Sequence, residues 1–297
     1  MNATPLRYPG GKSIMSPFFE KLIKLNSLKN VIYSEPYAGG AGAAINLLLN
    51  NSVEAIQIND ASRGIFSFWD SLINEGEKFL DKVYKTDVTL KEWQSQRLIF
   101  KNPTSASFDL AFATFFLSRT NRSGILAAGP IGGQDEKNQQ IAKYKIDCRF
   151  NKIELIERLQ KIIDKRDKIF VSNLDALVFL KQIRSENAFV YLDPPYYAQG
   201  KALYLNYYHH EDHVMLANFL RYSANFNWVL SYDSVPEILE LYSDFPLFEF
   251  VLNYSAQDSK KGTELLTHSS RISFHSITSI KKQVEMGMLR SMEFENI

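Results

Sequence analysis

The sequence predicts an α/β fold whose sheet is interrupted by a helical insertion, and three observations support this prediction. A strand over Val31–Glu35, a glycine-rich turn, a helix over Ala43–Asn50 and a strand over Ala55–Ile58 form a β-loop-α-β unit. Such a unit is expected to be right-handed, with parallel strands. Apolar runs typical of buried strands return after residue 167, whereas Ser62–Ile163 shows mostly helical periodicity.

The remaining elements follow in chain order. A loop over Asn121–Gln134 interrupts the helical stretch. Further strands are expected at 168–171, 189–192, 228–231, 248–251 and 271–274, with a polar hairpin loop over Ala256–Thr263. We therefore expect one discontinuous domain made of residues 1–64 and 166–297, with residues 65–165 as the helical insert.

Composition excludes several classes of protein. The 297 residues are 45% apolar and 23% charged, as in ordinary globular proteins. A single cysteine, Cys148, rules out an intrachain disulfide and a cysteine zinc cluster. His209 and His213 stand four apart, but a helix surface explains them better than a metal site, so no metal is expected. No apolar run reaches the roughly 20 residues that span a bilayer, and the polar N-terminus is unlike a signal peptide, so a cytoplasmic protein is expected.

The charges are unevenly distributed along the chain. The net charge is +1, yet residues 97–166 hold 13 Lys and Arg against 7 Asp and Glu. A basic segment on an acidic remainder indicates a part that meets phosphates. The alternative is that these residues only solvate helix faces.

The most informative motif is Asp193-Pro194-Pro195-Tyr196, directly after the apolar run Ala188–Leu192. Ligands of open α/β sheets bind at the carboxyl ends of strands, and prolines cannot extend a sheet. The motif therefore predicts a rigid corner with a carboxylate, an unpaired backbone carbonyl and a flat ring, which suits a planar group that carries an amine. The alternative is a turn with a solvated Asp193.

Three other motifs lie at strand ends or near the N-terminus. The run from Glu35 to Gly42 has three glycines within four residues, which allow close approach of a ligand with hydroxyls or a cationic amine. Asp60 ends the next strand and can hold a ribose, or can serve only as a cap. The N-terminal Tyr8 and Lys12 flank a Gly-Gly pair, where they can meet a ligand or belong to a mere surface segment.

At this point the order of motifs resembles one family. The runs LRYPGGK, EPYAGGAG, IQIND, SNLDAL, FVYLDPPYY and VLSYDS follow the pattern of the Dam-like, alpha-group site-specific DNA adenine-N6 methyltransferases, over about residues 4–268. The resemblance implies a Rossmann-like sheet of the S-adenosylmethionine-dependent methyltransferases, with 65–165 as the target-recognition insert. The loop after Leu117 departs from that of GATC readers, so no recognition sequence is implied.

The resemblance also implies roles for individual residues. S-adenosylmethionine is expected at Tyr8, Lys12, Glu35, Pro36, Gly40, Asp60, Asp175 and Asp193, with Lys12 on its carboxylate, Asp60 on its ribose and Asp175 on its adenine. The catalytic residues are expected to be Asp193, Pro194 and Tyr196. The basic segment and its polar loop, and not the resemblance, lead us to expect contacts with DNA from Arg119, Asn121, Arg122 and Ser123, which can reach base edges. The alternative is that each of them is only a structural residue of the loop.

The implied activity is methylation of the exocyclic amine of adenine in double-stranded DNA (EC 2.1.1.72), with base flipping and direct in-line transfer. Methylation of cytosine in DNA or of adenine in RNA, and a silent DNA-binding homologue, are the alternatives. A monomer is expected, with a dimer and a cognate restriction endonuclease left open. The expected location is the cytoplasm of a bacterial or phage-infected cell, associated with the nucleoid.

Overall fold

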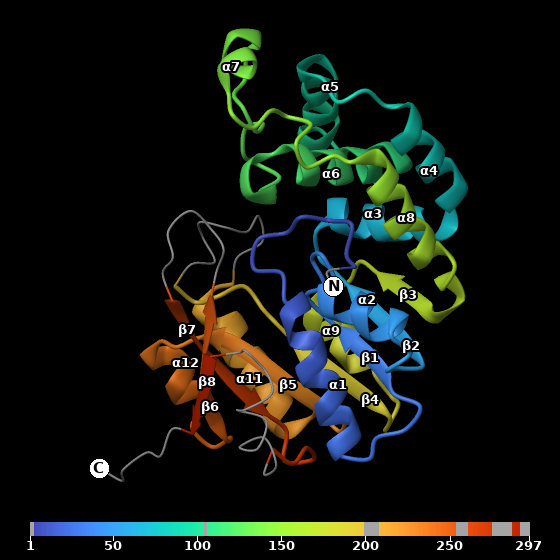
Figure 1. Ribbon diagram of the computed structural model, residues 1–297. Coiled ribbons are helices and arrows are strands. Elements are labelled where there is room, and N and C mark those ends of the chain that lie inside the picture. The colour runs from blue at the N-terminus through green and yellow to red at the C-terminus, as the bar shows by residue number, and fades with distance from the viewer. Residues whose placement is uncertain (1–2, 104–105, 199–207, 254–260, 275–286, 292–297) are drawn as a thin grey trace. The chain divides into compact units, whose positions relative to one another are not determined.

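The computed structural model describes residues 3–103, 106–198, 208–253, 261–274 and 287–291 of the chain (Figure 1). The chain packs as two compact units. The first consists of Met1–Ser16 and Ala38–Asn173, and the second of Pro17–Tyr37 and Leu174–Ile297. These boundaries differ from the discontinuous domain and insert expected above, and that division stays a prediction.

The first unit joins a parallel strand pair to helices. Strands β2 (Ala55–Asn59) and β3 (Ile169–Ser172) pair from Ile56↔Ile169 to Asn59↔Ser172. The described helices are η1 (Ser13–Met15), α2 (Gly42–Leu49), α3 (Arg63–Asn74), α4 (Gly76–Lys85), α5 (Leu90–Lys101), α6 (Phe108–Thr120), η2 (Arg122–Gly124), α7 (Glu136–Ile141), α8 (Lys152–Ile163) and η3 (Arg166–Lys168).

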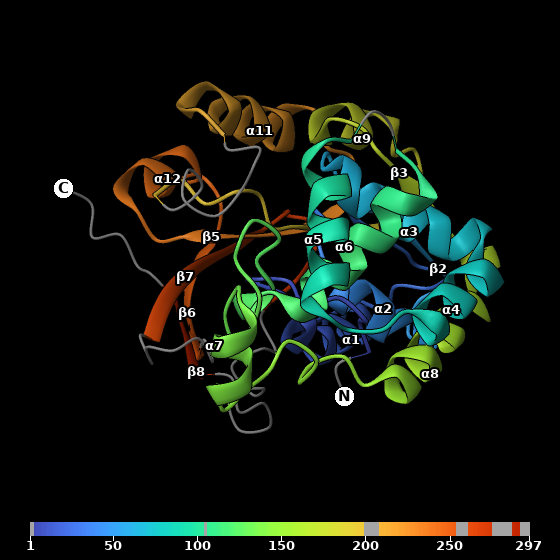
Figure 2. The same ribbon diagram turned by 90° about the horizontal axis from the view of Figure 1, so that it is seen from above.

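Helix α6 is the centre of the helical part. It lies between α3 and α5 (Figures 1 and 2) and is apolar on every side, as a helix surrounded by others must be. Phe112, Phe115 and Phe116 pack against aromatic rings of α3, α4 and the segment before α8. Its first turn is capped by Ser107, whose hydroxyl accepts the amide of Leu110 at 3.1 Å.

The second unit holds a mixed sheet in the order β1-β4-β5-β7-β6-β8. Strands β1 (Ile32–Glu35), β4 (Ala188–Leu192) and β5 (Asn227–Asp233) are parallel. Strands β7 (Lys261–His268), β6 (Leu247–Asn253) and β8 (Gly287–Ser291) continue the sheet antiparallel. The described helices are α1 (Ser16–Leu25), α9 (Ala176–Gln182), α11 (His210–Tyr222) and α12 (Pro236–Leu241), of which α1 begins one residue before the unit.

Strand alternation divides this sheet into two buried faces. Val190, Leu192 and Leu230 belong to the core formed with α9, α11 and α12, the last two of which lie on the same side of β5 and β7 (Figure 2). Tyr191 and its neighbours of the same parity face the other way, where Phe19 of α1 lies 4.6 Å from the Tyr191 ring. The parity of a residue in β4 or β5 therefore determines which helices surround it.

The structure confirms a mixed α/β fold and most of the expected elements, but one expected strand is wrong. Residues 271–274 form a turn and loop rather than a strand, although Ile272 and Phe274 are buried. The Phe274 ring stacks on His268 with centroids 3.8 Å apart. The apolar alternation there comes from loop packing and not from strand pairing.

Two further differences concern the end of the sheet. Residues 256–260 of the expected hairpin loop lie outside the described residues. Its last three residues, 261–263, belong to β7. Strand β8 had no expected counterpart. Within the described ranges, every helix is too short or too polar to cross a membrane.

Candidate functional site

The glycine-rich turn after β1 is held by four groups of the first unit. The amide of Ala38 donates to the carbonyl of Asn59 at 2.9 Å, and the amide of Gly39 donates to Asp60 Oδ2 at 2.8 Å. Trp69 Nε1 of α3 donates to the carbonyl of Gly39 at 3.0 Å, and the hydroxyl of Thr4 donates to the carbonyl of Gly40. The backbone at this strand end is therefore fixed before any ligand binds.

The N-terminal segment lies directly on this turn. Gly39 has a φ of +46°, and a Cβ placed there would stand 2.6 Å from the ring of Tyr8. A Cβ on Gly40 would stand 3.1 Å from the Cβ of Tyr8. The two glycines thus allow the Tyr8 ring to approach the backbone of the turn, and the amide of Gly39 joins this turn to Asp60.

Asp60 links the turn to the start of the next helix. Its Oδ1 accepts the amide of Ser62 at 2.8 Å, while Oδ2 accepts Gly39. Burial raises the pKa of Asp60 to about 6, although the two amides favour the charged form. Each carboxylate oxygen has a second lone pair, so the group can still accept a ligand hydroxyl.

Other predicted cofactor residues occupy varied environments. In the first unit, Lys12 is buried at the start of η1. In the second unit, Glu35 is buried and accepts the hydroxyl of Tyr33 at 3.0 Å, and Pro36 is buried beside it in the chain. Asp175 is exposed and caps α9, because its Oδ1 accepts the amide of Leu177 at 2.9 Å.

A chain of hydroxyls in the second unit holds the predicted catalytic carboxylate. Ser231 of β5 donates to Asp193 Oδ1 at 2.9 Å, and the Tyr191 hydroxyl lies 2.7 Å from Ser231 Oγ. Because Ser231 gives its one proton to the carboxylate, Tyr191 must donate to Ser231. Burial, together with the Asp193 charge, raises the pKa of Tyr191 well above its ordinary range, which keeps that proton on the phenol.

Asp233, the acid of β5, holds the backbone that follows the two prolines. Asp233 Oδ1 accepts the amide of Tyr197 at 2.9 Å, and its Oδ2 accepts the amide of Ala198 at 2.8 Å. Pro194 is buried between these two anchors along the chain. Ser231 and Asp233 were not predicted, yet both lie in the VLSYDS run. Strand alternation, which gives Tyr191 and Ser231 the same parity, was the signal that could have found them.

Tyr196 interacts with two residues of the sheet. Its phenol interacts electrostatically with the carboxylate of Glu264, a buried residue of β7, and the centroid of its ring lies 6.4 Å from that of Tyr232. Burial first, and then the charges of Asp193 and Glu264, raise the pKa of Tyr196 well above its ordinary range. The ring is therefore a neutral, partly exposed platform with a restricted orientation.

Asn121, one of the residues predicted to contact DNA, lies inside the protein. The residue is fully buried, and its Oδ1 accepts Trp93 Nε1 at 2.7 Å. Its Nδ2 donates to the carbonyls of Ile125 and Leu126, both at 3.0 Å. The amide of Asn121 therefore joins the loop to Trp93 of α5, and its predicted contact with DNA stays a prediction.

The other loop candidates differ from one another. Arg122 and Ser123 are exposed, and Ser123 has a φ of +55°, a conformation that is uncommon outside glycine. Arg119 is half-buried at the end of α6, where its Nε donates to the carbonyl of Arg149 at 2.8 Å. The loop therefore presents Arg122 and Ser123 outward, while Arg119 supports its base.

Two features can be set aside. His213 is buried, its Nδ1 lies 2.6 Å from the hydroxyl of Tyr232, and burial lowers its pKa to about 4, so it is a core residue.

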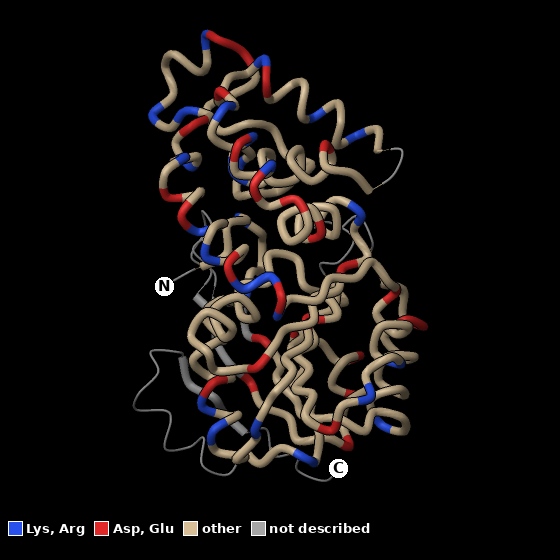
Figure 3. Tube along the Cα trace, turned by 90° about the vertical axis from the view of Figure 1, so that its right-hand side faces the viewer, with Lys and Arg blue, Asp and Glu red and all other residues tan. Residues whose placement is uncertain are grey.

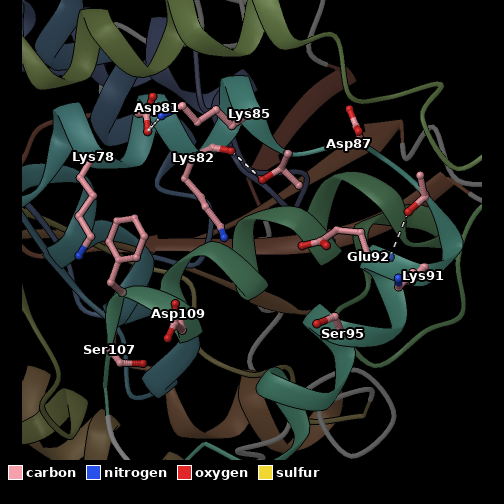
Figure 4. Close-up of a pocket in the computed structure, with 13 residues that line it drawn as sticks. Lys78, Asp81, Lys82, Lys85, Asp87, Lys91, Glu92, Ser95, Ser107 and Asp109 are labelled. Atoms are coloured by element: carbon pink, nitrogen blue, oxygen red, sulfur yellow. Dashed lines mark hydrogen bonds and ion pairs between the residues drawn. The ribbon is translucent and has the colours of Figure 1, made fainter.

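A pocket of about 960 Å³ among α4, α5 and the start of α6 (Figure 4) is lined by equal numbers of basic and acidic residues. Those residues are Lys78, Lys82, Lys85, Lys91, Asp81, Asp87, Glu92 and Asp109. Their balance gives the pocket no preference for a phosphate.

Comparison with known proteins identifies the family. Residues 8–256 match the model of the D12 class N6 adenine-specific DNA methyltransferases. The chain belongs to this family. The match includes the glycine turn, Asp60, the Asp193 corner and the loop after α6, so the family points to methylation of adenine in DNA as its activity.

Other comparisons add little to this assignment. No curated protein matches the chain. A crystal structure of a Legionella pneumophila strain Philadelphia 1 protein of the DUF519 family is 12% identical and has a TM-score of 0.39. That alignment covers 97% of this chain and 99% of the other, and at this similarity it carries no argument about function.

The contact between Gly39 and Tyr8 generates a stability prediction. Gly39→Ala is expected to lower the free energy of unfolding by about 2 kcal/mol or more, because left-handed backbone costs about 1–2 kcal/mol in a residue with a Cβ and overpacking about 1–3 kcal/mol. Urea unfolding measures this difference. Gly40→Ala, the matched control, should cost less. In a Tyr8→Ala background the overpacking should disappear, and strict additivity of the two changes would contradict the contact.

Burial of Asp60 generates a pH prediction. Its folded-state pKa of about 6 exceeds the ordinary value of 3.8, so the folded state keeps a proton that the unfolded state has lost between these values. Stability from this group is therefore present at low pH and is lost as the pH rises through about 6. Urea unfolding at pH 4–7 should show the parent losing stability relative to Asp60→Asn over this window. A difference that grows in the opposite direction would contradict the assignment.

Proposed function

We propose that this D12 class protein is a site-specific DNA methyltransferase that uses S-adenosylmethionine to methylate N6 of adenine in double-stranded DNA. The observation that supports this most strongly is the corner at Asp193, whose carboxylate is held at 2.9 Å by Ser231 while Asp233 holds the following backbone. The order of the motifs along the chain supports the alpha-group subtype. The reaction class is EC 2.1.1.72.

The corner can make a poor nucleophile reactive. The lone pair of the adenine amine is delocalised into the ring, so the nitrogen must become more tetrahedral before it attacks. Asp193 and the carbonyl of Pro194 each accept one amine hydrogen, which directs the lone pair out of the ring plane. Because Ser231 orients the carboxylate in advance, little reorganisation is needed when charge develops.

The target adenine must leave the duplex to reach this corner. Flipping a base costs a few kcal/mol of unstacking and unpairing. Tyr196 offers a ring for the flipped base, and the packing of this ring beside Tyr232 limits the directions in which it can turn. The site therefore recovers part of the cost through stacking on a platform that is already oriented.

The residues of the glycine turn fit the cofactor. S-adenosylmethionine supplies a methyl group carried on a sulfonium. In the first unit, we assign Tyr8, Lys12, Gly40 and Asp60 to its binding, because the Tyr8 ring already lies against a turn without side chains. Asp60 has lone pairs for ribose hydroxyls, and Lys12 matches a carboxylate. Glu35, Pro36, Asp175 and Asp193 of the second unit are assigned to the same cofactor from the order of the motifs along the chain alone.

The loop after α6 is assigned to reading the DNA. Arg122 and Ser123 are its exposed polar candidates, and an arginine can recognise guanine through two hydrogen bonds. The buried Asn121 is assigned to loop folding instead. Acidic and basic positions are interspersed along the helices (Figure 3). We therefore assign recognition of the DNA to the loop rather than to a basic helix face.

Loss of Asp193 tests the function directly. Asp193→Ala is expected to abolish methyl transfer while leaving the thermal unfolding midpoint near that of the parent. The assay incubates each protein with labelled S-adenosylmethionine and plasmid DNA, and then separates the nucleosides. Asp167→Ala, an exposed acid after α8, serves as the control.

The nucleoside products separate the alternatives. N6-methyladenine from the parent supports the proposal, whereas N4-methylcytosine, or label in RNA only, would replace it. Binding of the methyl donor with no transfer to any nucleic acid would indicate a silent homologue. Activity of Asp193→Ala within tenfold of the parent, about 1.4 kcal/mol, would show that the amine is activated elsewhere.

Ser231 is expected to act as a positioning residue. Ser231→Ala should lower kcat about ten- to hundredfold with little change in KM for DNA, since it removes a charge-assisted hydrogen bond worth about 1.5–3 kcal/mol. Tyr191→Phe should cost less, because Ser231 still reaches Asp193 in that variant. Steady-state kinetics of both variants test this order. Equal losses in both, or a rise in KM alone, would indicate general damage to the core.

A further inference from the structure

Four arginines of the first unit converge on the N-terminal segment and the start of the loop after α6. Arg119 donates to the carbonyl of Arg149 at 2.8 Å and to that of Pro5 at 3.5 Å. Arg158 of α8 donates to the carbonyl of Thr4 at 3.5 Å. Arg7 donates to the carbonyl of Asn121 at 3.3 Å. We call these residues, Arg7, Arg119, Arg149 and Arg158, the arginine cluster.

The cluster has more positive charge than its protein partners offset. In the described part of the chain, one carboxylate pairs with it, that of Glu154 on Arg158. The other contacts are backbone carbonyls, which supply partial charges only. Burial first, and then Arg7 and Arg158, lower the pKa of Arg119 to about 10. Burial is the larger cause and the neighbouring charges add to it, while Arg119 stays charged near neutral pH.

A purely structural role explains only part of the cluster. Arg119 and Arg158 hold the N-terminal segment through the carbonyls of Pro5 and Thr4. Arg149 is exposed and Arg7 is half-buried, so these two guanidinium groups can still meet a ligand. Planar guanidinium groups match the geometry of phosphate oxygens with paired hydrogen bonds. A bound phosphate would offset the part of the repulsion between the arginines that the backbone carbonyls do not.

We infer that the arginine cluster binds one phosphate group of the DNA backbone at the base of the loop that begins at Asn121. The cluster borders this loop on two sides, since Arg119 precedes it by two residues and Arg7 bonds to its first carbonyl. The backbone carbonyl of Arg7 also lies against Gly124 of the loop. A phosphate here sets the register in which Arg122 and Ser123 meet the bases.

This inference rests on the proposed function, because it takes duplex DNA as the partner. A free phosphate ion offers the same chemistry without a neighbouring strand. The two sources differ in one measurable respect. A backbone contact contributes to the salt dependence of DNA binding, by about 0.9 in the logarithmic slope for each phosphate neutralised, whereas a site for free phosphate does not.

The test measures binding of the full-length protein to a labelled duplex of arbitrary sequence at several salt concentrations, without methyl donor. The Arg7→Gln/Arg149→Gln double variant should lose about 0.9 from the slope, and each single variant no more than that. Arg184→Gln, an exposed arginine outside both the cluster and the basic segment 97–166, is the matched control and should lose none. The melting temperature in sodium phosphate, against sodium chloride at equal ionic strength, is measured for the same proteins.

The outcomes separate the sources of the phosphate. A slope loss confined to the cluster variants, equal on several sequences, supports the inference. An unchanged slope overturns it, and phosphate protection of the parent alone would then assign the cluster to the free ion. An equal loss of slope in the control variant would overturn the inference, because the salt dependence would then come from the charge of the whole surface and not from the cluster. Arg149→Gln alters an exposed side chain and keeps the test available if the double variant does not fold. This experiment measures binding and not methyl transfer. If the slope does not change, the proposed function still stands, and if the methyl-transfer assay gives no product, the binding result still stands.

Discussion

The arrangement of the first unit depends on the contact between the Tyr8 ring and a turn that has no side chains at Gly39 and Gly40. Gly39 is in a left-handed conformation, and its amide and carbonyl are bonded to Asp60 and Trp69. This contact brings the N-terminal segment onto the strand end. The residue before Tyr8 then reaches the loop after α6, where Arg7 bonds to the carbonyl of Asn121. Two adjacent side chains thus connect the proposed cofactor turn with the proposed DNA-reading loop.

In the second unit, a carboxylate and two prolines are held at the end of a buried strand. Prolines cannot take part in sheet hydrogen bonding, so the corner needs anchors from elsewhere. The neighbouring strand β5 provides them through Ser231 and Asp233. Both groups are polar residues in a largely buried strand, and placing them there costs desolvation that their hydrogen bonds offset. The corner is therefore preorganised by the sheet and not by the loop itself.

The loop after α6 shows how burial reverses an expectation based on residue type. An asparagine beside arginines in a polar loop is a reasonable base reader, yet the Asn121 amide satisfies the indole of Trp93 and two loop carbonyls. Leaving those groups unpaired inside the protein would cost about 1–3 kcal/mol each. Burial also acts on Arg119, where desolvation first and the neighbouring arginines second lower the pKa of its guanidinium to about 10.

The sequence by itself determined the fold class, the positions of most strands, the long helical segment and the residues at the strand ends, because periodicity and turn composition are local properties. The family resemblance added the expected roles of the residues in the corner and in the glycine turn. Only the tertiary structure decided that 271–274 is a loop, that Asn121 is buried, and that Ser231, Asp233 and Glu264 support the corner. It also decided that Arg7, Arg119, Arg149 and Arg158 meet, although they are spread over more than 150 residues. These outcomes depend on packing and hydrogen bonds between distant segments, which no local pattern records.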